Sequence, residues 1–288
     1  MAICPKAHTK TARTVSTCLA ALLAIGAMAC PAASLAQDAF LSTRPTPRQE
    51  YWQVRETEIA RQLAQVKDLP RYKLVFIGDS ITDFWQMHED LWVKGLWHGG
   101  ALWDETFGGL DPTNYALNLG ISGDRTEHML YRLMPKSAGG QGELEAPDLT
   151  PDYLVIMAGI NNSWAPEPKT ADAIFAGVEA VVKLAHHQKP KARIILQSIL
   201  PTLDPIKNRD IVQPVNERLS ALAQSPELSA STIYLDLYPA FIDAMGKQRS
   251  ELFVDGLHPN TAGYLIWRDQ LVPTLAADRA KGTHSHSR

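Results

Sequence analysis

Two short motifs hold the residues of this chain that could act as a nucleophile and its base. The run 78–82, GDSIT, contains Ser80, and the run 255–259, DGLHP, places Asp255 three residues ahead of His258. A serine hydroxyl becomes a good nucleophile when a histidine takes its proton and a carboxylate orients that histidine. The spacing of Asp255 and His258 lets these two side chains meet within one turn. On this motif alone Ser80 could equally cap a helix, because serine is a preferred N-cap residue.

Two further motifs offer hydrogen-bond donors. The run 120–124, GISGD, is rich in glycine, so its backbone can approach a ligand closely. The run 159–162, GINN, contributes the side-chain amide of Asn161. A tetrahedral intermediate needs donors aimed at its oxyanion. We therefore predict an oxyanion hole made of the backbone N–H groups of Ser80 and Gly120 and the amide of Asn161.

The elements that must position these motifs read as an α/β domain. Five mostly apolar runs predict strands buried on both faces, and amphipathic helical patterns separate them. Such a pattern is typical of an open parallel sheet covered on both faces, in which ligands bind beyond the carboxyl ends of the strands. The predicted strands are 73–77, 115–119, 153–158, 193–198 and 232–235.

The motifs, taken in order, resemble the blocks of the SGNH or GDSL hydrolases. The matching runs are FIGDSIT at 76–82, NLGISGD at 118–124, GINN at 159–162 and DGLHP at 255–259. Three more runs resemble the branch that contains the platelet-activating factor acetylhydrolase catalytic subunits: RTEHMLYRL at 125–133, KPKARIILQSILPT at 189–202 and YLDLYPAF at 234–241. The wider family commonly has Asp where this chain has Asn162, but that branch also carries Asn-Asn there.

The resemblance implies a flavodoxin-like three-layer α/β/α sandwich with a five-stranded parallel sheet. It also implies Ser80 as nucleophile, Asp255 and His258 as the rest of the triad, and Gly120 and Asn161 as the rest of the oxyanion hole. The segment between Phe84 and Asn114 is added length that compact members of the family lack.

Several residues beside these motifs are candidates for substrate contact. Asp79 and Asn162 adjoin the predicted catalytic positions. Trp164 lies three residues past Asn161, at the same edge of the sheet. Four tryptophans fall in the added segment, and we expect most of them to pack that segment onto the domain. Trp85 is the expected exception, because it follows Ser80 by five residues. The four are Trp85, Trp92, Trp97 and Trp103.

The N-terminal region predicts export. Three basic residues precede an apolar run at 15–28 that is too short for a membrane span of roughly 20 residues, and small residues follow it. We therefore expect residues 1–36 to be an export signal, which places the mature protein in the periplasm or outside the cell without stable membrane insertion. Lipid attachment at Cys30 is the less favoured alternative. We expect 37–49 to be a linker, 50–277 the single hydrolase domain and 278–288 a polar tail.

Charge and motif content exclude several classes of function. The chain has 28 Lys and Arg against 31 Asp and Glu, and removal of residues 1–36 takes three of the basic residues, which leaves a balance of −6. This balance argues against a nucleic-acid binder. All three cysteines lie within 1–36, and no Walker A, Gly-x-Gly-x-x-Gly or His-Glu-x-x-His pattern is present. We expect neither a metal nor a cofactor.

These observations favour an exported serine esterase that removes short acyl groups, acetyl foremost, through an acyl-serine intermediate. Acetylated carbohydrates or small acyl esters are the preferred substrates, because nothing in the mature chain predicts an interfacial amphipathic helix. A lipid acyl hydrolase such as a lysophospholipase, with the same mechanism, is the alternative, and a non-catalytic glycan-binding module is a third reading. We expect the rate to fall as His258 becomes protonated at low pH.

Overall fold

Five parallel strands form the central sheet of the computed structural model, which describes residues 40–48, 51–90 and 93–285. The strand order is β2-β1-β3-β4-β5. The predicted fold class is therefore confirmed, and each strand begins and ends within one residue of its predicted ends. The strands are β1 Leu74–Gly78, β2 Ala116–Asn118, β3 Tyr153–Met157, β4 Arg193–Gln197 and β5 Thr232–Leu235.

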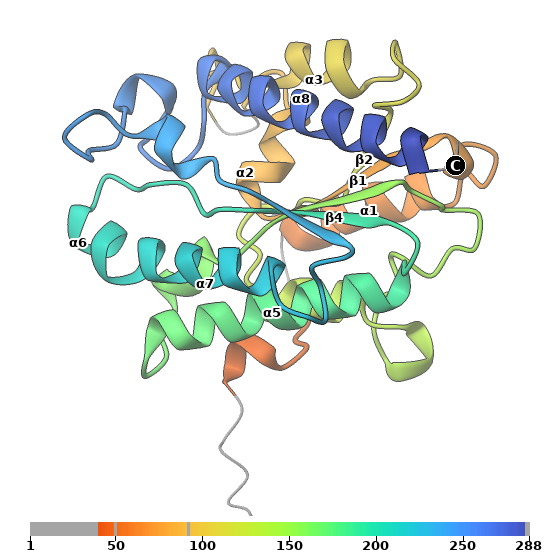
Figure 1. Ribbon diagram of the computed structural model, residues 1–288, viewed down its shortest axis with the longest axis horizontal. Coiled ribbons are helices and arrows are strands. Elements are labelled where there is room, and N and C mark those ends of the chain that lie inside the picture. Colours follow the sequence, from red (N-terminus) through yellow and green to blue (C-terminus); the bar gives the residue numbers. More distant parts are fainter. Residues whose placement is uncertain (1–39, 49–50, 91–92, 286–288) are drawn as a thin grey trace, which may run out of the picture. The chain divides into compact units, whose positions relative to one another are not determined.

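Helices cover both faces of this sheet. Figure 1 shows α5 and α7 on one face and α3 and α8 on the other. No helix in the described part of the chain has the length and apolar character to cross a bilayer. The α-helices are α1 Tyr51–Leu63, α2 Ser80–Asp83, α3 Gly100–Phe107, α4 Thr126–Leu133, α5 Thr170–Gln188, α6 Pro205–Lys207, α7 Gln213–Ala223 and α8 Thr261–Ser285. Short 3-10 helices are η1 Leu41–Thr43, η2 Leu69–Arg71, η3 Phe84–Gln86, η4 Lys136–Ala138, η5 Ile160–Trp164, η7 Tyr238–Phe241 and η8 Ser250–Leu252, and Asn208–Val212 is a π-helix, η6.

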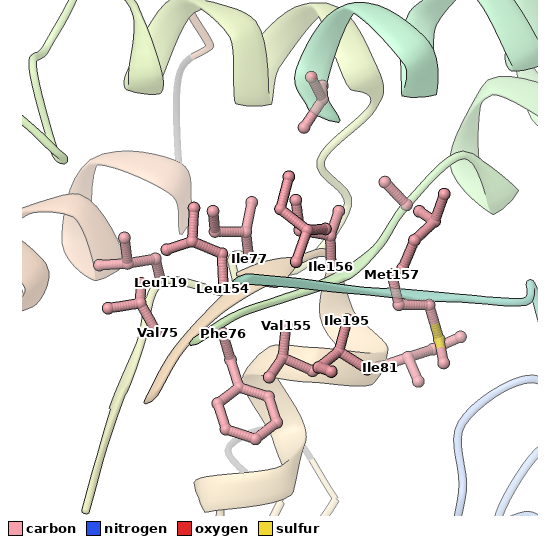
Figure 2. Close-up of a cluster of buried hydrophobic side chains, with 14 of the residues drawn as sticks. Val75, Phe76, Ile77, Ile81, Leu119, Leu154, Val155, Ile156, Met157 and Ile195 are labelled. Atoms are coloured by element: carbon pink, nitrogen blue, oxygen red, sulfur yellow. The ribbon is translucent and has the colours of Figure 1, made fainter. Parts of the chain in front are cut away.

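The apolar runs of the strands supply the core on both sides of the sheet. Neighbouring strands are in register, so that Phe76 pairs with Val155 and Val155 with Ile195. Alternate side chains of a strand point to opposite faces, which is why a strand covered on both faces needs apolar residues throughout. Figure 2 shows this alternation, with Phe76, Val155 and Ile195 on one side of the sheet and Ile77, Leu154 and Ile156 on the other.

The segment before α1 is docked onto the domain, unlike the linker expected at 37–49. Ser42 is buried and its hydroxyl donates to the carbonyl oxygen of Ala173 in α5 at 2.7 Å. Its backbone N–H donates to the carboxylate of Glu167 at 2.9 Å. The segment has no apolar periodicity because these anchors are polar, so its composition alone looked like that of a linker.

The expected polar tail at 278–288 is also wrong as far as the structure describes it. Helix α8 continues to Ser285, and Asp278 is buried. The Asp278 carboxylate lies 2.7 Å from Arg193 Nη1 and accepts a hydrogen bond of 2.9 Å from the hydroxyl of Tyr153. These polar contacts fix the helix to the beginning of β3 and β4.

Candidate active site

Ser80 lies at the point where β1 turns into α2. The turn needs glycine at position 78, because a Cβ there would lie 2.1 Å from Thr82 Oγ1 and 2.7 Å from the carbonyl oxygen of Met157. The N-cap of α2 is Asp79, whose carboxylate accepts the N–H of Ile81 at 3.0 Å. Because Asp79 supplies the cap, the hydroxyl of Ser80 is free for another partner.

That partner is His258, 178 residues further along the chain. The distance between His258 Nε2 and Ser80 Oγ is 2.8 Å, and the distance between His258 Nδ1 and Asp255 Oδ2 is 2.7 Å. This geometry fits an imidazole that donates from Nδ1 to the carboxylate and accepts from the serine hydroxyl. The structure thus brings together the nucleophile, base and orienting carboxylate expected from the sequence.

The loop that carries Asp255 and His258 is folded around the carboxylate itself. Asp255 Oδ1 accepts the backbone N–H groups of Leu257 at 2.9 Å and of His258 at 2.8 Å. Gly256 has φ +81°, a left-handed conformation that glycine adopts without strain. Burial alone would raise the pKa of Asp255, but the hydrogen bonds from His258 and from the backbone outweigh burial and hold this pKa well below its usual range. Asp255 is therefore ionised at neutral pH.

A side chain that the sequence did not suggest supports the imidazole. The ring of Phe84 is buried, and its centroid lies 4.9 Å from that of His258. Phe84 begins η3, directly after the one-turn helix α2 that starts at Ser80. The nucleophile and the wall behind its base therefore come from one short segment.

The expected oxyanion role of Gly120 is contradicted by the structure. Its backbone N–H donates to Asn118 Oδ1 at 2.8 Å, and its carbonyl oxygen accepts from Arg55 Nε at 3.1 Å. A Cβ at this position would lie 2.5 Å from the backbone nitrogen of Asp83. Gly120 is needed because α2 packs closely against it, and its N–H is not available to a substrate.

Gly123, three residues further on, is the better donor in the same loop. It has φ +78°, and its N–H donates to no group within the described ranges. Asp124 follows Gly123, and its carbonyl oxygen accepts from Asn161 Nδ2 at 2.9 Å. The second hydrogen of the Asn161 amide is therefore free. Ser80 N–H, at the first position of α2, has no acceptor within its helix. The Ser-Gly-Asp sequence, a turn signal, could have identified Gly123.

Asp79 and Asn162 do not face a substrate as expected. Asp79 is 1% exposed, and burial raises its pKa to about 7, although the N–H of Ile81 partly offsets this effect. Asn162 is buried between η5 and α4, where its Oδ1 accepts the N–H of Thr126 at 3.1 Å and its Nδ2 donates to Glu127 Oε2 at 2.8 Å. Both residues hold the backbone of the site in place.

Trp85 is also not a substrate contact. It is fully buried in the aromatic cluster between the sheet and α8, where its ring lies 5.3 Å from that of Tyr264 and 4.4 Å from that of Trp267. Trp103 is buried in the same cluster, whereas Trp97 is exposed. Trp92 lies outside the described residues. Trp85 follows Ser80 closely in sequence, but η3 turns its side chain inward to the core.

Trp164 is the one predicted tryptophan contact that the structure leaves accessible. Its side chain is 53% exposed at the end of η5, the short helix that also carries Asn161. Lys207 Nζ lies 3.8 Å from the centroid of its ring.

The described ranges contain no group of three or more His, Cys, Asp or Glu side chains placed to hold a metal ion. The groups gathered around Ser80 are a base, a carboxylate and N–H donors, which are the components that acyl transfer requires.

Comparison with known proteins agrees with this chemistry. A model of the GDSL-like lipase/acylhydrolase family matches residues 76–266. The platelet-activating factor acetylhydrolase IB subunit alpha1 of Homo sapiens is 32% identical over 216 residues, which cover 73% of this chain and 80% of that protein. The alpha2 subunit of Mus musculus is 31% identical over 194 residues, which cover 66% of this chain and 70% of that protein.

Solved structures share the fold. A GDSL-like lipase from Bacteroides thetaiotaomicron superposes with a TM-score of 0.53 at 22% identity and covers 78% of this chain and 97% of its own. A catalytic mutant of Axe2, an acetylxylan esterase from Geobacillus stearothermophilus, gives a TM-score of 0.50 at 21% identity and covers 71% and 94%. From the family match and the close curated relatives, this chain belongs to the GDSL-like lipase/acylhydrolase family and is a carboxylic ester hydrolase.

Proposed function

We propose that this protein is an exported esterase that removes short acyl groups, acetyl foremost, from alcohol oxygens through an acyl-serine intermediate. The observation that carries the proposal is the continuous contact from Ser80 Oγ through the imidazole of His258 to the carboxylate of Asp255. Export rests on the basic and apolar pattern of residues 1–36.

The reaction runs in two halves. Ser80 Oγ attacks the acyl carbon while His258 Nε2 takes the hydroxyl proton, and Asp255 stabilises the resulting imidazolium. The tetrahedral intermediate collapses as His258 gives that proton to the departing alcohol oxygen, which leaves the acyl group on Ser80. Water then attacks the acyl-serine with His258 again as base, and the acid and the free serine are released. Ser80 N–H, Gly123 N–H and the amide of Asn161 stabilise the oxyanion in both halves.

A short acyl group suits the surroundings of the nucleophile. Ser80 is 4% exposed, which leaves little room for a bulky group to approach its hydroxyl. The two curated relatives are named as acetylhydrolase subunits, which also supports an acetyl group. We place the substrate among acetylated carbohydrates and small acyl esters.

The test is hydrolysis of para-nitrophenyl acetate, butyrate and octanoate by the protein without residues 1–36, with Ser80→Ala and Ser229→Ala beside it. Ser229 is an exposed serine in the loop before β5 and serves as the matched control. We expect acetate to give the highest kcat/KM, Ser229→Ala to match the wild type, and Ser80→Ala to lose on the order of a thousandfold or more.

Two results would overturn parts of the proposal. If octanoate is the best substrate, the short-acyl preference is wrong and a lipid acyl hydrolase takes its place. If Ser80→Ala is folded, as judged by circular dichroism, and retains the wild-type rate, Ser80 is not the nucleophile. Export is tested separately, by expressing the full chain and sequencing the N-terminus of the protein recovered outside the cytoplasm.

A further inference from the structure

Four side chains form a rim between the loop of Asp255 and His258 and the helix η5, which carries Asn161. They are Leu203, Ile206, Lys207 and Trp164. Leu203 is 61% exposed and Ile206 is 60% exposed. Leu203 contacts the loop that carries Asp255 and His258, since a Cβ at Gly256 would lie 2.2 Å from Leu203 Cδ1. Gln248 Nε2 fastens the same region by donating to the carbonyl oxygens of Pro201 and Gly256 at 2.7 and 2.8 Å. The segment after β4 therefore lies against the loop that carries His258.

The other end of this rim reaches η5. The N-cap of α6 is Asp204, whose Oδ1 accepts the N–H groups of Ile206 at 2.8 Å and of Lys207 at 3.2 Å. The ammonium of Lys207 then lies over the ring of Trp164, three residues from Asn161. Side chains from α6 and η5 thus meet beyond the carboxyl ends of β3 and β4, the end of the sheet at which Ser80 follows β1.

The charge at this contact is not neutralised. Within the described ranges no carboxylate lies at ion-pair distance from Lys207 Nζ, although Asp204 exerts a weaker attraction. Partial burial lowers the pKa of Lys207. The next cation along the chain, Arg209, is already paired with Asp210 at 2.5 and 2.7 Å. One ammonium, oriented by an aromatic face, is therefore left for an external anion.

We propose that Lys207 and Trp164 form a subsite for the alcohol portion of the ester, and that this portion carries a single negative charge. This inference rests on the proposed function: a short acyl group ends close to Ser80, so only the alcohol portion extends as far as the rim. A monoanion matches the single unpaired ammonium, whereas a dianion would need further donors. The exposed side chains of Trp164 and Ile206 give apolar contact to a ring that bears the charge, as in an acetylated sugar acid.

The experiment compares two esters that differ in one charge. They are para-acetoxybenzoate and its neutral methyl ester, and the quantity measured is the kcat/KM of the first divided by that of the second, here named the charge ratio. Each substrate is compared with itself across variants, so differences in intrinsic reactivity cancel. The variants are Lys207→Met, Lys207→Glu, Trp164→Ala and Trp164→Phe, with Lys191→Met as the matched control. Lys191 is an exposed lysine that precedes β4, at the opposite end of the strands from Ser80.

We expect Lys207→Met to lower the charge ratio about fivefold at low ionic strength, since the site is partly exposed to solvent. Lys207→Glu should lower it further, and Lys191→Met should leave it at the wild-type value. Salt should reduce the ratio of the wild type toward that of Lys207→Met, because ions screen the attraction. Trp164→Ala should lower the ratio and Trp164→Phe should largely restore it, since a ring is needed to orient the ammonium.

The two proposals fail in different ways. If the methyl ester is hydrolysed in a Ser80-dependent manner but the charge ratio is the same in the wild type, Lys207→Met and Lys191→Met, the subsite is wrong and the esterase stands. If neither ester is hydrolysed faster than by Ser80→Ala, both proposals are wrong. A third ester, para-acetoxyphenyl methyl phosphate, identifies the source of the charge. The substrate with the larger dependence on Lys207 shows whether the subsite is built for a carboxylate or for a phosphodiester.

Discussion

The guanidinium of Arg48 lies 3.0 Å from the carboxylate of Asp124, which belongs to the loop after β2. Arg48 Nη1 also donates to the carbonyl oxygen of Ser122 at 2.9 Å. Between these two contacts lies Gly123, where a Cβ would be 2.8 Å from Arg48 Nη2. The carbonyl oxygen of Asp124 in turn accepts from Asn161. A residue of the docked N-terminal segment therefore braces the loop that contributes the oxyanion donors.

We expect Arg48→Met to lower kcat about tenfold with a smaller change in KM, because a looser loop misplaces the N–H of Gly123 in the transition state. The fold should hold, since Asp124 keeps its buried contact with Arg132 at 2.8 Å. Steady-state kinetics on para-nitrophenyl acetate and a thermal melt measure the two effects. Arg209→Met is the control, because it removes an exposed ion pair with Asp210 in η6, outside this loop. An unchanged kcat in Arg48→Met would show that the loop does not need this brace.

Gly120→Ala and Gly123→Ala distinguish the packing role of Gly120 from the oxyanion role of Gly123. The added methyl group of Gly120→Ala meets backbone atoms of α2, which cannot move aside, so we expect the melting temperature to fall by several degrees. The methyl group of Gly123→Ala meets the end of a flexible arginine, but the left-handed φ strains the backbone at this amide. We expect Gly123→Ala to fold and to lose about tenfold or more in kcat. The assignment is wrong if folded Gly123→Ala is fully active.

The sequence was sufficient to place Ser80, Asp255 and His258 at one end of the sheet. The carboxyl ends of parallel strands meet there, and each motif follows a predicted strand or precedes the last helix. It was not sufficient to choose between Gly120 and Gly123, since that choice depends on which N–H is already bonded within the fold. It also could not show that Trp85 turns inward, because five residues of separation from Ser80 do not fix the direction of a side chain. Segments anchored by polar contacts, such as the one containing Ser42, carry no periodic pattern by which to predict them.

Asp79 should make stability depend on pH. Its folded pKa of about 7 lies above the ordinary value of 3.8, so the folded state binds more protons between these values. The free energy of unfolding should therefore fall as pH rises from about 4 to about 7, and the loss should be complete above this range. Asp79→Asn keeps an oxygen for the N–H of Ile81 and removes the charge. We expect this variant to gain stability relative to the wild type as pH rises, with the largest difference at pH 8.

Urea unfolding at several pH values between 4 and 8 measures this difference. Asp148→Asn, which changes an exposed carboxylate in the loop before β3, is the control and should follow the wild type. If the stability difference between Asp79→Asn and the wild type is the same at every pH, the buried carboxyl does not titrate in this range.

Trp85→Ala tests whether the aromatic cluster beneath the site serves packing or substrate binding. The ring is fully buried against Phe76, Tyr264 and Trp267, so its loss leaves a cavity and should cost about 3–5 kcal/mol in the free energy of unfolding. Trp85→Phe refills part of that volume and should cost less. Because Trp85 reaches no surface, KM for para-nitrophenyl acetate should be unchanged in whichever variant remains folded at the assay temperature. Trp164→Ala should give the opposite result. KM should rise, and stability should be kept because the ring of Trp164 is largely exposed. A raised KM in folded Trp85→Phe, with stability close to that of the wild type, would return Trp85 to the substrate-binding residues.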